Sequence, residues 1–166
     1  IVEALQADGI AILNADDELV VGMASRTNAK VVTFSTQTKA DYYATGIVLD
    51  DVARATFTMH TPGGEHEVSL KVFGAHQVSN ALAAAAVGIE SGIDVAAVAE
   101  ALSNAHSVSV NRMDVSTCAD GVTVINDAYN ANPDSMRAGI AALAFTAAAR
   151  PGVRSIAVLG EMGELG

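Results

Sequence analysis

The sequence has a single cysteine, few positive charges and no long apolar run. Cys118 cannot form a disulfide within the chain, and because no cationic cluster lies near it we interpret it as structural. No apolar run approaches the ~20 residues of a membrane-spanning helix, so we expect no membrane insertion. The 19 acidic and 9 basic residues give a formal net charge of -10, which argues against nucleic acid or an anionic membrane surface as a partner. With no secretion signal, this composition favours a cytoplasmic protein.

Several common signatures of ligand and catalytic sites are also missing. The chain has no G-x-x-x-x-G-K-[ST] phosphate loop, no G-x-S-x-G nucleophile turn and no zinc-binding pattern. The glycine-rich residues 160–166 include two glutamates and no lysine, so they would repel phosphate, and their spacing is not G-x-G-x-x-G. These absences disfavour a nicotinamide-binding domain and leave open a nucleotide contact without a phosphate loop.

The composition and the two ends suggest part of a longer folded protein. Apolar residues make up 51% of the 166 residues and charged residues 17%, which allows a buried core and excludes disorder. There is no initiator methionine, residues 1–5 are typical of the end of a helix, and the chain stops just after an expected strand and loop. We therefore expect a fragment that contains parts of two domains.

The first part of the chain alternates strand and helix. Residues 9–13 and 30–34 are apolar runs suited to buried strands, and Asp16 could cap a helix between them. A strand–helix–strand unit with short connections implies a parallel sheet. Three short β-rich segments follow: 47–49, 55–59 and 65–73. We interpret these as a small antiparallel flap at the edge of the sheet.

Two histidines, His60 and His66, flank the turn expected inside this flap. A histidine pair can indicate a metal site, but no cysteine or carboxylate stands at ligand spacing from it. We therefore favour exposed histidines of a hairpin over a metal centre.

Helices return after the flap. Residues 76–90 and 95–102 have apolar side chains at helical spacing, and Gly92 and Asp94 are suited to end the first helix and cap the second. This pattern predicts an αα-hairpin.

A second strand–helix–strand unit is expected at the end of the chain. Residues 121–125 and 154–159 are predicted strands on either side of a helix at 133–149. We place a domain boundary within residues 107–111, so that 1–110 and 111–166 belong to different domains of an α/β protein.

The most informative stretch is D-A-Y-N-A-N-P-D-S-M at residues 127–136. It follows an expected buried strand at 122–125 and leads into a helix, with Asn132 as the N-cap and Pro133 at the first helical position. A polar turn between a strand and a helix N-terminus is where open α/β sheets bind ligands. On local grounds, a well-capped connection and a binding site explain the stretch equally well.

Several side chains could contact a nucleotide. His76 and Asn80 are four residues apart on one helix face, where a carboxamide could pair with a purine edge, although capping and loop contacts explain them equally well. Arg112 could bind phosphate through its two-pronged guanidinium, or be a surface charge at a linker. Asp127 could accept hydrogen bonds from ribose hydroxyls. Tyr129 offers a flat face to a base or sugar, or packs half-buried.

A further acidic group follows the first expected strand: Asn14, Asp16 and Asp17. Paired carboxylates at this edge of the sheet could hold magnesium. We favour the alternative, in which Asp16 caps the helix that follows.

Four segments occur together in one order and spacing: L-N-A-D-D at 13–17, G-A-H-Q-V-S-N-A-L-A-A-A-A at 74–86, the 127–136 stretch, and I-A-V-L-G-E-M-G-E-L-G at 156–166. Together they resemble the Mur ligase family over nearly the whole chain. Y-N-A-N-P at 129–133 is similar to the branch of UDP-N-acetylmuramoyl-tripeptide–D-alanyl-D-alanine ligases. The chain departs from the family pattern at Gln77, where asparagine is expected, and at Asn111, where many relatives have glycine.

The resemblance implies an architecture and a set of site residues. Residues 1–110 would be the later part of a central ATPase domain, with its parallel sheet, antiparallel flap and αα-hairpin, and 111–166 the start of a Rossmann-like C-terminal ligase domain. Arg112 would be the catalytic residue that reaches the nucleotide phosphates. The expected nucleotide-binding residues are His76, Asn80, Arg112, Asp127 and Tyr129, and the expected substrate-binding residues are Asn130 and Asn132.

The reaction implied by the resemblance is ATP-dependent amide formation through an acyl phosphate. UDP-MurNAc-tripeptide and D-Ala-D-Ala would be the substrates of a monomeric full-length enzyme. ATP and Mg²⁺ would be required, with the metal ligands, the phosphate loop and a carbamylated lysine upstream of residue 1. We therefore expect this fragment alone to be inactive. The alternatives are another Mur-type ligase, a folylpolyglutamate synthase or a non-catalytic α/β binding module.

Overall fold

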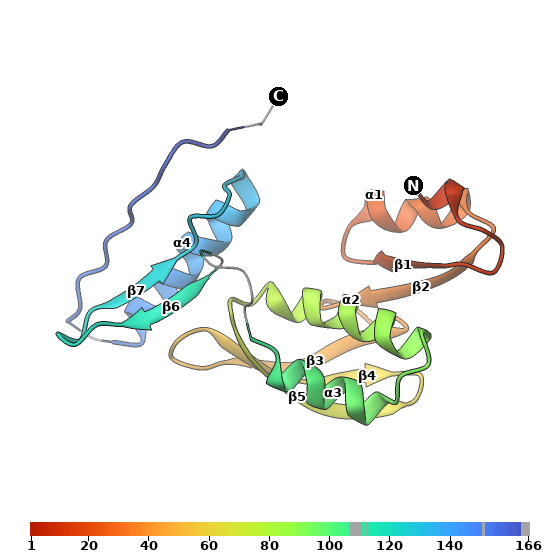
Figure 1. Cartoon of the computed structure of the whole chain (residues 1–166), viewed down its shortest axis with the longest axis horizontal. Coiled ribbons are helices and arrows are strands. Elements are labelled where there is room, and N and C mark those ends of the chain that lie inside the picture. Colours follow the sequence, from red (N-terminus) through yellow and green to blue (C-terminus); the bar gives the residue numbers. More distant parts are fainter. Residues whose placement is uncertain (107–110, 112, 151, 164–166) are drawn as a thin grey trace. The chain divides into compact units, whose positions relative to one another are not determined.

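The computed structural model describes residues 1–106, 111, 113–150 and 152–163 (Figure 1). These residues form helices together with parallel and antiparallel strands, so the predicted α/β class is confirmed. The chain divides into two compact units. Unit 1 comprises Ile1–Val48, Thr56–Ser69 and Val78–Asn104, and unit 2 comprises Leu49–Ala55, Leu70–Gln77 and Ala105–Gly166.

Unit 1 begins with the expected strand–helix–strand unit. Strands β1 and β2 are parallel, with Ile10 opposite Lys30 and Asn14 opposite Phe34. Buried Ala11 and Leu13 on alternate positions of β1 form part of the core. The first residues contain a single 3-10 turn instead of the expected end of a helix. In order, the elements are η1 (Val2–Ala4), β1 (Ile10–Asn14), α1 (Glu18–Val21), η2 (Gly22–Arg26) and β2 (Lys30–Ser35).

The β-rich middle segments continue the same sheet. Its strand order is β1-β2-β3-β4-β5, and β3 is parallel to β2. Only two residues connect β4 to β5, a link that is short enough for antiparallel neighbours alone. Tyr42, Phe57, Met59 and Val68 from these strands are fully buried. The strands are β3 (Tyr42–Leu49), β4 (Arg54–Thr61) and β5 (Gly64–Phe73).

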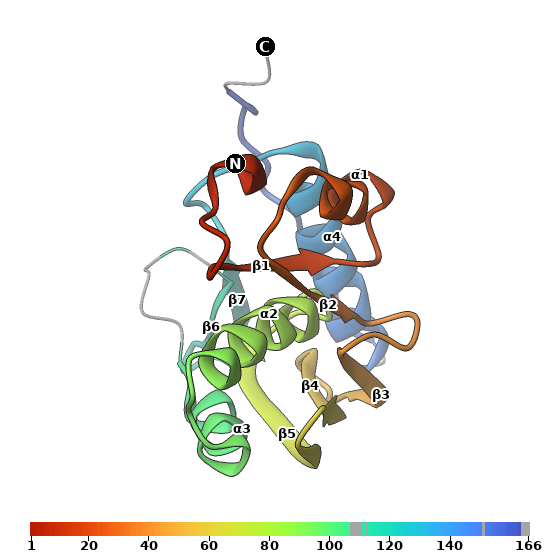
Figure 2. The same cartoon turned by 90° about the vertical axis from the view of Figure 1, so that its right-hand side faces the viewer.

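The predicted αα-hairpin is confirmed. Helices α2 (Gln77–Glu90) and α3 (Val95–Asn104) lie side by side in both views (Figures 1 and 2). Gly92 has a φ of +91° after the end of α2, and Asp94 Oδ1 accepts hydrogen bonds from the first N–H groups of α3. The last turn of α2 is fixed to the sheet because Glu90 accepts hydrogen bonds from Lys30 at 2.6 Å and Tyr42 at 3.1 Å.

The expectation of exposed histidines in the flap was wrong. His60 and His66 are both half-buried. The ring of His60 stacks on Tyr43 at a centroid distance of 4.3 Å, and its Nε2 lies 2.7 Å from Thr45 Oγ1. Its Nδ1 lies 3.0 Å from Glu65 Oε1, within ion-pair range but without hydrogen-bond geometry. The neighbouring strand therefore covers His60, which a single-strand pattern does not reveal.

Unit 2 contains a two-stranded antiparallel hairpin and one long helix. Strands β6 (Asp114–Thr117) and β7 (Thr123–Asn126) pair with Asp114 opposite Asn126. Helix α4 (Pro133–Ala148) follows, and Arg150 just beyond it donates a hydrogen bond to Thr123 Oγ1 at 2.7 Å. Cys118 is exposed and lies in the turn of the hairpin.

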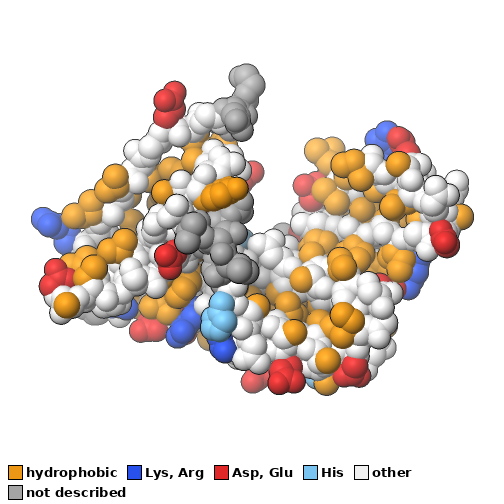
Figure 3. Space-filling view, viewed as in Figure 1, with side chains coloured by type: hydrophobic (Ala, Val, Ile, Leu, Met, Phe, Trp, Pro, Cys, Tyr) orange, Lys and Arg blue, Asp and Glu red, His pale blue; other side chains and the backbone are white. Residues whose placement is uncertain are grey.

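The second strand–helix–strand unit predicted from the sequence is not formed. Residues 154–159 have no regular structure, and Ile156, Val158 and Leu159 are exposed. The strand at 122–125 was expected to be buried, yet Val122 and Val124 are exposed as well. Hydrophobic side chains consequently gather on the surface of this unit (Figure 3). These side chains are exposed because, among the described residues, β7 pairs only with β6 and no further strand or helix covers them.

Within the described part of the chain, the helices are too short or too polar to cross a membrane.

Candidate functional site

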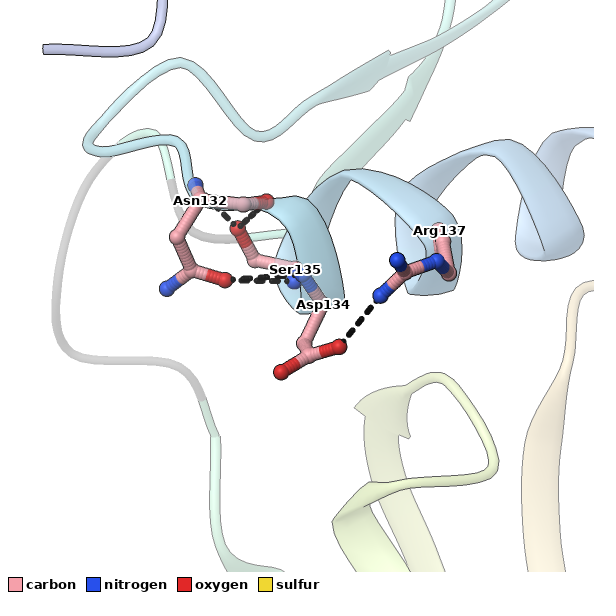
Figure 4. Close-up of polar contacts among 4 residues, drawn as sticks. All are labelled: Asn132, Asp134, Ser135 and Arg137. Carbon is pink, nitrogen blue, oxygen red and sulfur yellow. Dashed lines mark hydrogen bonds and ion pairs between the residues drawn. The ribbon is translucent and has the colours of Figure 1, made fainter. Parts of the chain in front are cut away.

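The N-terminus of α4 is closed by a reciprocal set of hydrogen bonds (Figure 4). Asn132 Oδ1 accepts from the backbone N–H groups of Asp134 at 3.0 Å and Ser135 at 2.9 Å. Ser135 Oγ accepts from the N–H of Asn132 at 3.0 Å, and Pro133 occupies the first helical position. The predicted cap at Asn132 is confirmed. The turn therefore enters the helix with a fixed backbone.

A second set of hydrogen bonds joins this turn to the segment before β6. Asp127 Oδ1 accepts from the N–H of Met113 at 3.0 Å. The N–H of Tyr129 donates to the carbonyl of Asn111 at 3.0 Å, and the side-chain amide of Asn126 donates to Asn111 Oδ1 at 2.8 Å. Residues 14 to 18 positions apart along the chain thus form one polar junction at the end of β7.

The backbone of this junction is unusual at two positions. Asn111 has a φ of +62° and Met113 a φ of +46°, in the left-handed region that L-residues seldom adopt. Asparagine tolerates this region better than other side chains that carry a Cβ. The predicted catalytic and phosphate-binding residue, Arg112, lies outside the described residues.

The side chains of residues 127–132, between β7 and α4, differ in how far they are exposed to a ligand. Tyr129 has 59% of its surface exposed, and Asn130 is exposed with its Oδ1 accepting from the N–H of Ala131 at 2.8 Å. Asn132 uses its Oδ1 in the cap, which leaves its Nδ2 as the group that could donate to a substrate. Asp127 is half-buried, and its Oδ2 is 3.8 Å from the position that a Cβ would take at Gly139.

His76 belongs to the same unit and interacts with Asp127. Burial of the ring lowers the pKa of His76 below its ordinary value, and the negative charge of Asp127 opposes this shift. The residue as a whole is nevertheless exposed, so the burial concerns the side of the ring that packs over Gly74. A lowered pKa favours the neutral imidazole, in which one nitrogen is a donor and the other an acceptor. Asn80 is exposed in the first turn of α2, four residues further along.

The acidic group after β1 belongs to unit 1 and is engaged in hydrogen bonds. The predicted cap at Asp16 was wrong, because Asp17 caps α1 by accepting from Leu19 and Val20. Asp16 instead accepts from Ser35 Oγ and from both the N–H and the hydroxyl of Thr36. No group of three His, Cys, Asp or Glu side chains that could hold a metal ion occurs among the described residues.

The structure brings together only part of the residues inferred from the sequence. Asp127 and Tyr129 share one junction with Asn111, and His76 interacts electrostatically with Asp127. Asn126, which links β7 to Asn111, was not among the residues inferred from the sequence. Its only signal was an amide at the last position of a strand, which is too common to be informative.

Two family models match this chain. The Mur ligase middle domain matches residues 1–88, and the glutamate ligase domain of Mur ligases matches residues 111–166.

Individual relatives agree with these matches. The UDP-N-acetylmuramoyl-tripeptide–D-alanyl-D-alanine ligase of Mycobacterium bovis is 53% identical over 165 residues, covering 99% of this chain and 32% of that protein. The UDP-N-acetylmuramate–L-alanine ligase of Stenotrophomonas maltophilia is 38% identical over 138 residues, covering 81% and 29%. The chain thus spans about a third of the length of these relatives.

Solved structures have the same fold. MurF from Acinetobacter baumannii superposes with a TM-score of 0.77 at 30% identity, covering 85% of this chain and 30% of that one. MurF from Thermotoga maritima, solved in complex with ADP, superposes with a TM-score of 0.70 at 20% identity, covering 86% and 32%. The second likeness concerns the fold alone.

Proposed function

Because the chain belongs to the Mur ligase family, we propose that it is the part of an ATP-dependent ligase that joins D-alanyl-D-alanine to UDP-N-acetylmuramoyl-tripeptide in peptidoglycan synthesis. The observation that carries the proposal is the junction at the end of β7. There, a half-buried carboxylate and an exposed tyrosine are held by hydrogen bonds within the stretch that resembles this branch of the family. The name of the Mycobacterium bovis relative supports the choice of reaction.

We propose that the chain contributes two domains to this enzyme. Residues 1–110 are assigned to the later part of the central ATP-binding domain and 111–166 to the start of the C-terminal ligase domain. The family-model matches at 1–88 and 111–166 lie on either side of this boundary and support it.

The residues of the junction fit a nucleoside. Asp127 has one oxygen in the bond to Met113, which orients the carboxylate, and its second oxygen can accept a hydrogen bond from a ribose hydroxyl. Tyr129 has an exposed ring that can stack on a base or sugar. Outside the junction, His76 and Asn80 are assigned to the nucleotide on the resemblance to the family, since an imidazole and a carboxamide can each donate and accept a hydrogen bond. Arg112 is proposed to stabilise the negative charge of the transferred phosphoryl group.

The described residues do not fit a closed magnesium site, since they hold no cluster of carboxylates and histidines. We propose that the ligands of Mg²⁺ lie in parts of the enzyme outside this chain. When bound, Mg²⁺ would neutralise charge on the phosphates.

The substrates are assigned to the same turn. Asn130 and Asn132 are exposed next to Tyr129, and Nδ2 of Asn132 could donate to a carboxylate or carbonyl of the incoming dipeptide. ATP would phosphorylate the carboxylate of the UDP-linked peptide, and the amine of D-Ala-D-Ala would then displace phosphate to form the amide. We assign this reaction to a monomeric enzyme of the cytoplasm.

Phosphate release by the full-length enzyme tests the proposal. ATP, magnesium and UDP-MurNAc-tripeptide are supplied with and without D-Ala-D-Ala, and release that depends on the dipeptide is the expected result. The likeness to an L-alanine-adding relative provides the second candidate, tested with UDP-MurNAc and L-alanine. Release with L-alanine instead of the dipeptide would assign the chain to that sibling activity, and release with neither acceptor would contradict both.

A further inference from the structure

Gly74 combines two features that exclude a side chain. Its φ is +104°, a conformation that L-residues rarely adopt, and it is buried. Its N–H donates to the carbonyl of Ala53 at 2.8 Å, and its own carbonyl accepts from the N–H of Gln77 at 3.0 Å. The backbone at this residue is therefore tied on one side to the sheet connection and on the other to the start of α2.

The space beside Gly74 is filled by the ring of His76. A Cβ at position 74 would lie 2.6 Å from Cε1 and 2.8 Å from Nδ1 of the imidazole, well inside van der Waals contact. Gly74 and His76 are only two residues apart in the chain. Since the Gly74 backbone is held by two hydrogen bonds, the ring would have to move if a side chain were added.

Comparison with the other glycines separates the two features. Gly46, Gly64, Gly92, Gly121 and Gly152 also have a positive φ, but a Cβ at each would meet nothing within 4 Å. Backbone conformation alone accounts for these five positions. Among the described glycines with positive φ, Gly74 alone has an aromatic ring in the place of its side chain.

We propose that Gly74 is a positioning residue for the nucleotide site, because its missing side chain leaves the space in which the His76 imidazole lies. The inference rests on the function proposed above, in which His76 and Asp127 contact the nucleotide. Gly74, the first residue of the G-A-H segment, would then contribute to ligand affinity as well as to chain conformation. A larger residue at position 74 would displace the ring while leaving Asp127 and its bond to Met113 intact.

The test compares two alanine variants of the full-length enzyme. Gly74→Ala and Gly92→Ala both force a residue with a Cβ into a similar left-handed backbone, with φ values of +104° and +91°, but only the first meets the imidazole. Gly74→Ala is expected to raise KM for ATP about five- to tenfold, the loss of roughly one well-placed hydrogen bond. KM for the UDP-linked peptide should not change, and Gly92→Ala should leave both constants near their wild-type values. Equal effects of the two variants on KM for ATP would overturn the proposal.

A double-mutant cycle tests whether Gly74 acts through His76. In a His76→Ala background, Gly74→Ala should raise KM for ATP no further, because the displaced ring is gone. The same rise in both backgrounds would mean that the backbone, and not the ring, is affected. If Gly74→Ala alone is too unstable to purify, recovery of folded enzyme in the Gly74→Ala/His76→Ala pair would support the contact, and no recovery would contradict it.

Imidazole titration followed by NMR provides a readout that does not depend on activity. Displacement of the ring toward water in Gly74→Ala should raise the pKa of His76 toward its ordinary value, since burial is what lowers it. An unchanged pKa in Gly74→Ala would contradict the positioning role. Absence of dipeptide-dependent phosphate release from the wild-type enzyme would refute the proposed function instead, and the titration would still test the position of the ring.

Discussion

The backbone N–H of Met113 donates to Asp127 Oδ1 at 3.0 Å, so a buried residue in a left-handed conformation is held by a carboxylate fourteen positions later. The bond uses only one oxygen of Asp127. Substitutions of Asp127 that keep or remove Oδ1 as an acceptor can therefore distinguish its contribution to stability from its contribution to ligand binding.

Asp127→Asn and Asp127→Ala should differ in stability. Asparagine retains Oδ1 as an acceptor for Met113, whereas alanine leaves a buried N–H unpaired, which costs about 1–3 kcal/mol. We expect urea denaturation to give a nearly unchanged free energy of unfolding for Asp127→Asn and a clear loss for Asp127→Ala. In the full-length enzyme, Asp127→Ala should also raise KM for ATP. Equal stability of the two variants would show that the bond to Met113 contributes nothing.

Substitutions of Asn132 distinguish its role in the cap from a role in substrate binding. Asn132→Ala should destabilise the chain by about 1 kcal/mol through loss of the N-cap. Asn132→Asp keeps an oxygen acceptor for the N–H groups of Asp134 and Ser135, so thermal unfolding should be unchanged.

Activity of the same variants completes the comparison. Asn132→Asp removes the Nδ2 donor, so it should raise KM for D-Ala-D-Ala in the full-length enzyme despite normal stability. An unchanged KM for the dipeptide would confine Asn132 to capping.

Asp16 should make stability depend on pH in the acid range. Burial alone would raise the pKa of Asp16, but hydrogen bonds from Ser35 and Thr36 outweigh it and lower the pKa below its ordinary value. Because the pKa is lower in the folded state, the stabilisation is complete above the ordinary value of about 4 and is lost as the pH falls through the lowered value. Asp16→Asn should therefore reduce stability at pH 7 by about 1–2 kcal/mol and flatten the acid side of the stability profile.

Asp17→Asn is the matched control for this experiment. Asp17 is exposed and caps α1, and asparagine is an equally good N-cap, so stability at pH 7 should match that of the wild type. A profile for Asp16→Asn as steep as that of the control would contradict the role of the Ser35 and Thr36 bonds.

Val158 should tolerate a charge without loss of stability. It is 92% exposed, and exposed substitutions usually change the free energy of unfolding by less than about 0.5 kcal/mol. In the 166-residue chain, Val158→Lys should leave thermal unfolding unchanged and reduce binding of the dye ANS, because the apolar surface of unit 2 becomes smaller. Leu19→Lys, at an exposed site of unit 1, is the control for the addition of a charge. A large drop in melting temperature for Val158→Lys would mean that the segment is packed.

The sequence predicted elements that depend on local signals. The parallel β1–α1–β2 unit, the αα-hairpin and the caps at Asp94 and Asn132 follow from apolar spacing and from residues next to one another in the chain. Even there, the cap of α1 was assigned one residue too early, because Asp16 and Asp17 are equally suited to it by type. Only the position of Ser35 and Thr36 in space decides between the two.

Features that depend on distant neighbours could not be predicted. The apolar run 154–159 has the composition of a buried strand, but a strand needs a partner, and the run itself does not specify one. His60 is half-buried because Tyr43 of the adjacent strand stacks on it. Likewise, G-A-H identified His76 as a candidate ligand residue but could not reveal that its ring occupies the space of a side chain at Gly74.

The left-handed backbone at Asn111 also limits how this position can vary in evolution. Glycine adopts such a φ freely, asparagine and aspartate accept it at moderate cost, and β-branched residues are nearly excluded. Natural variants should therefore be confined to these three residue types, and of the three only asparagine and aspartate offer a side-chain acceptor to the amide of Asn126. At Asn111 the left-handed backbone is thus accompanied by a side-chain hydrogen bond that glycine could not make.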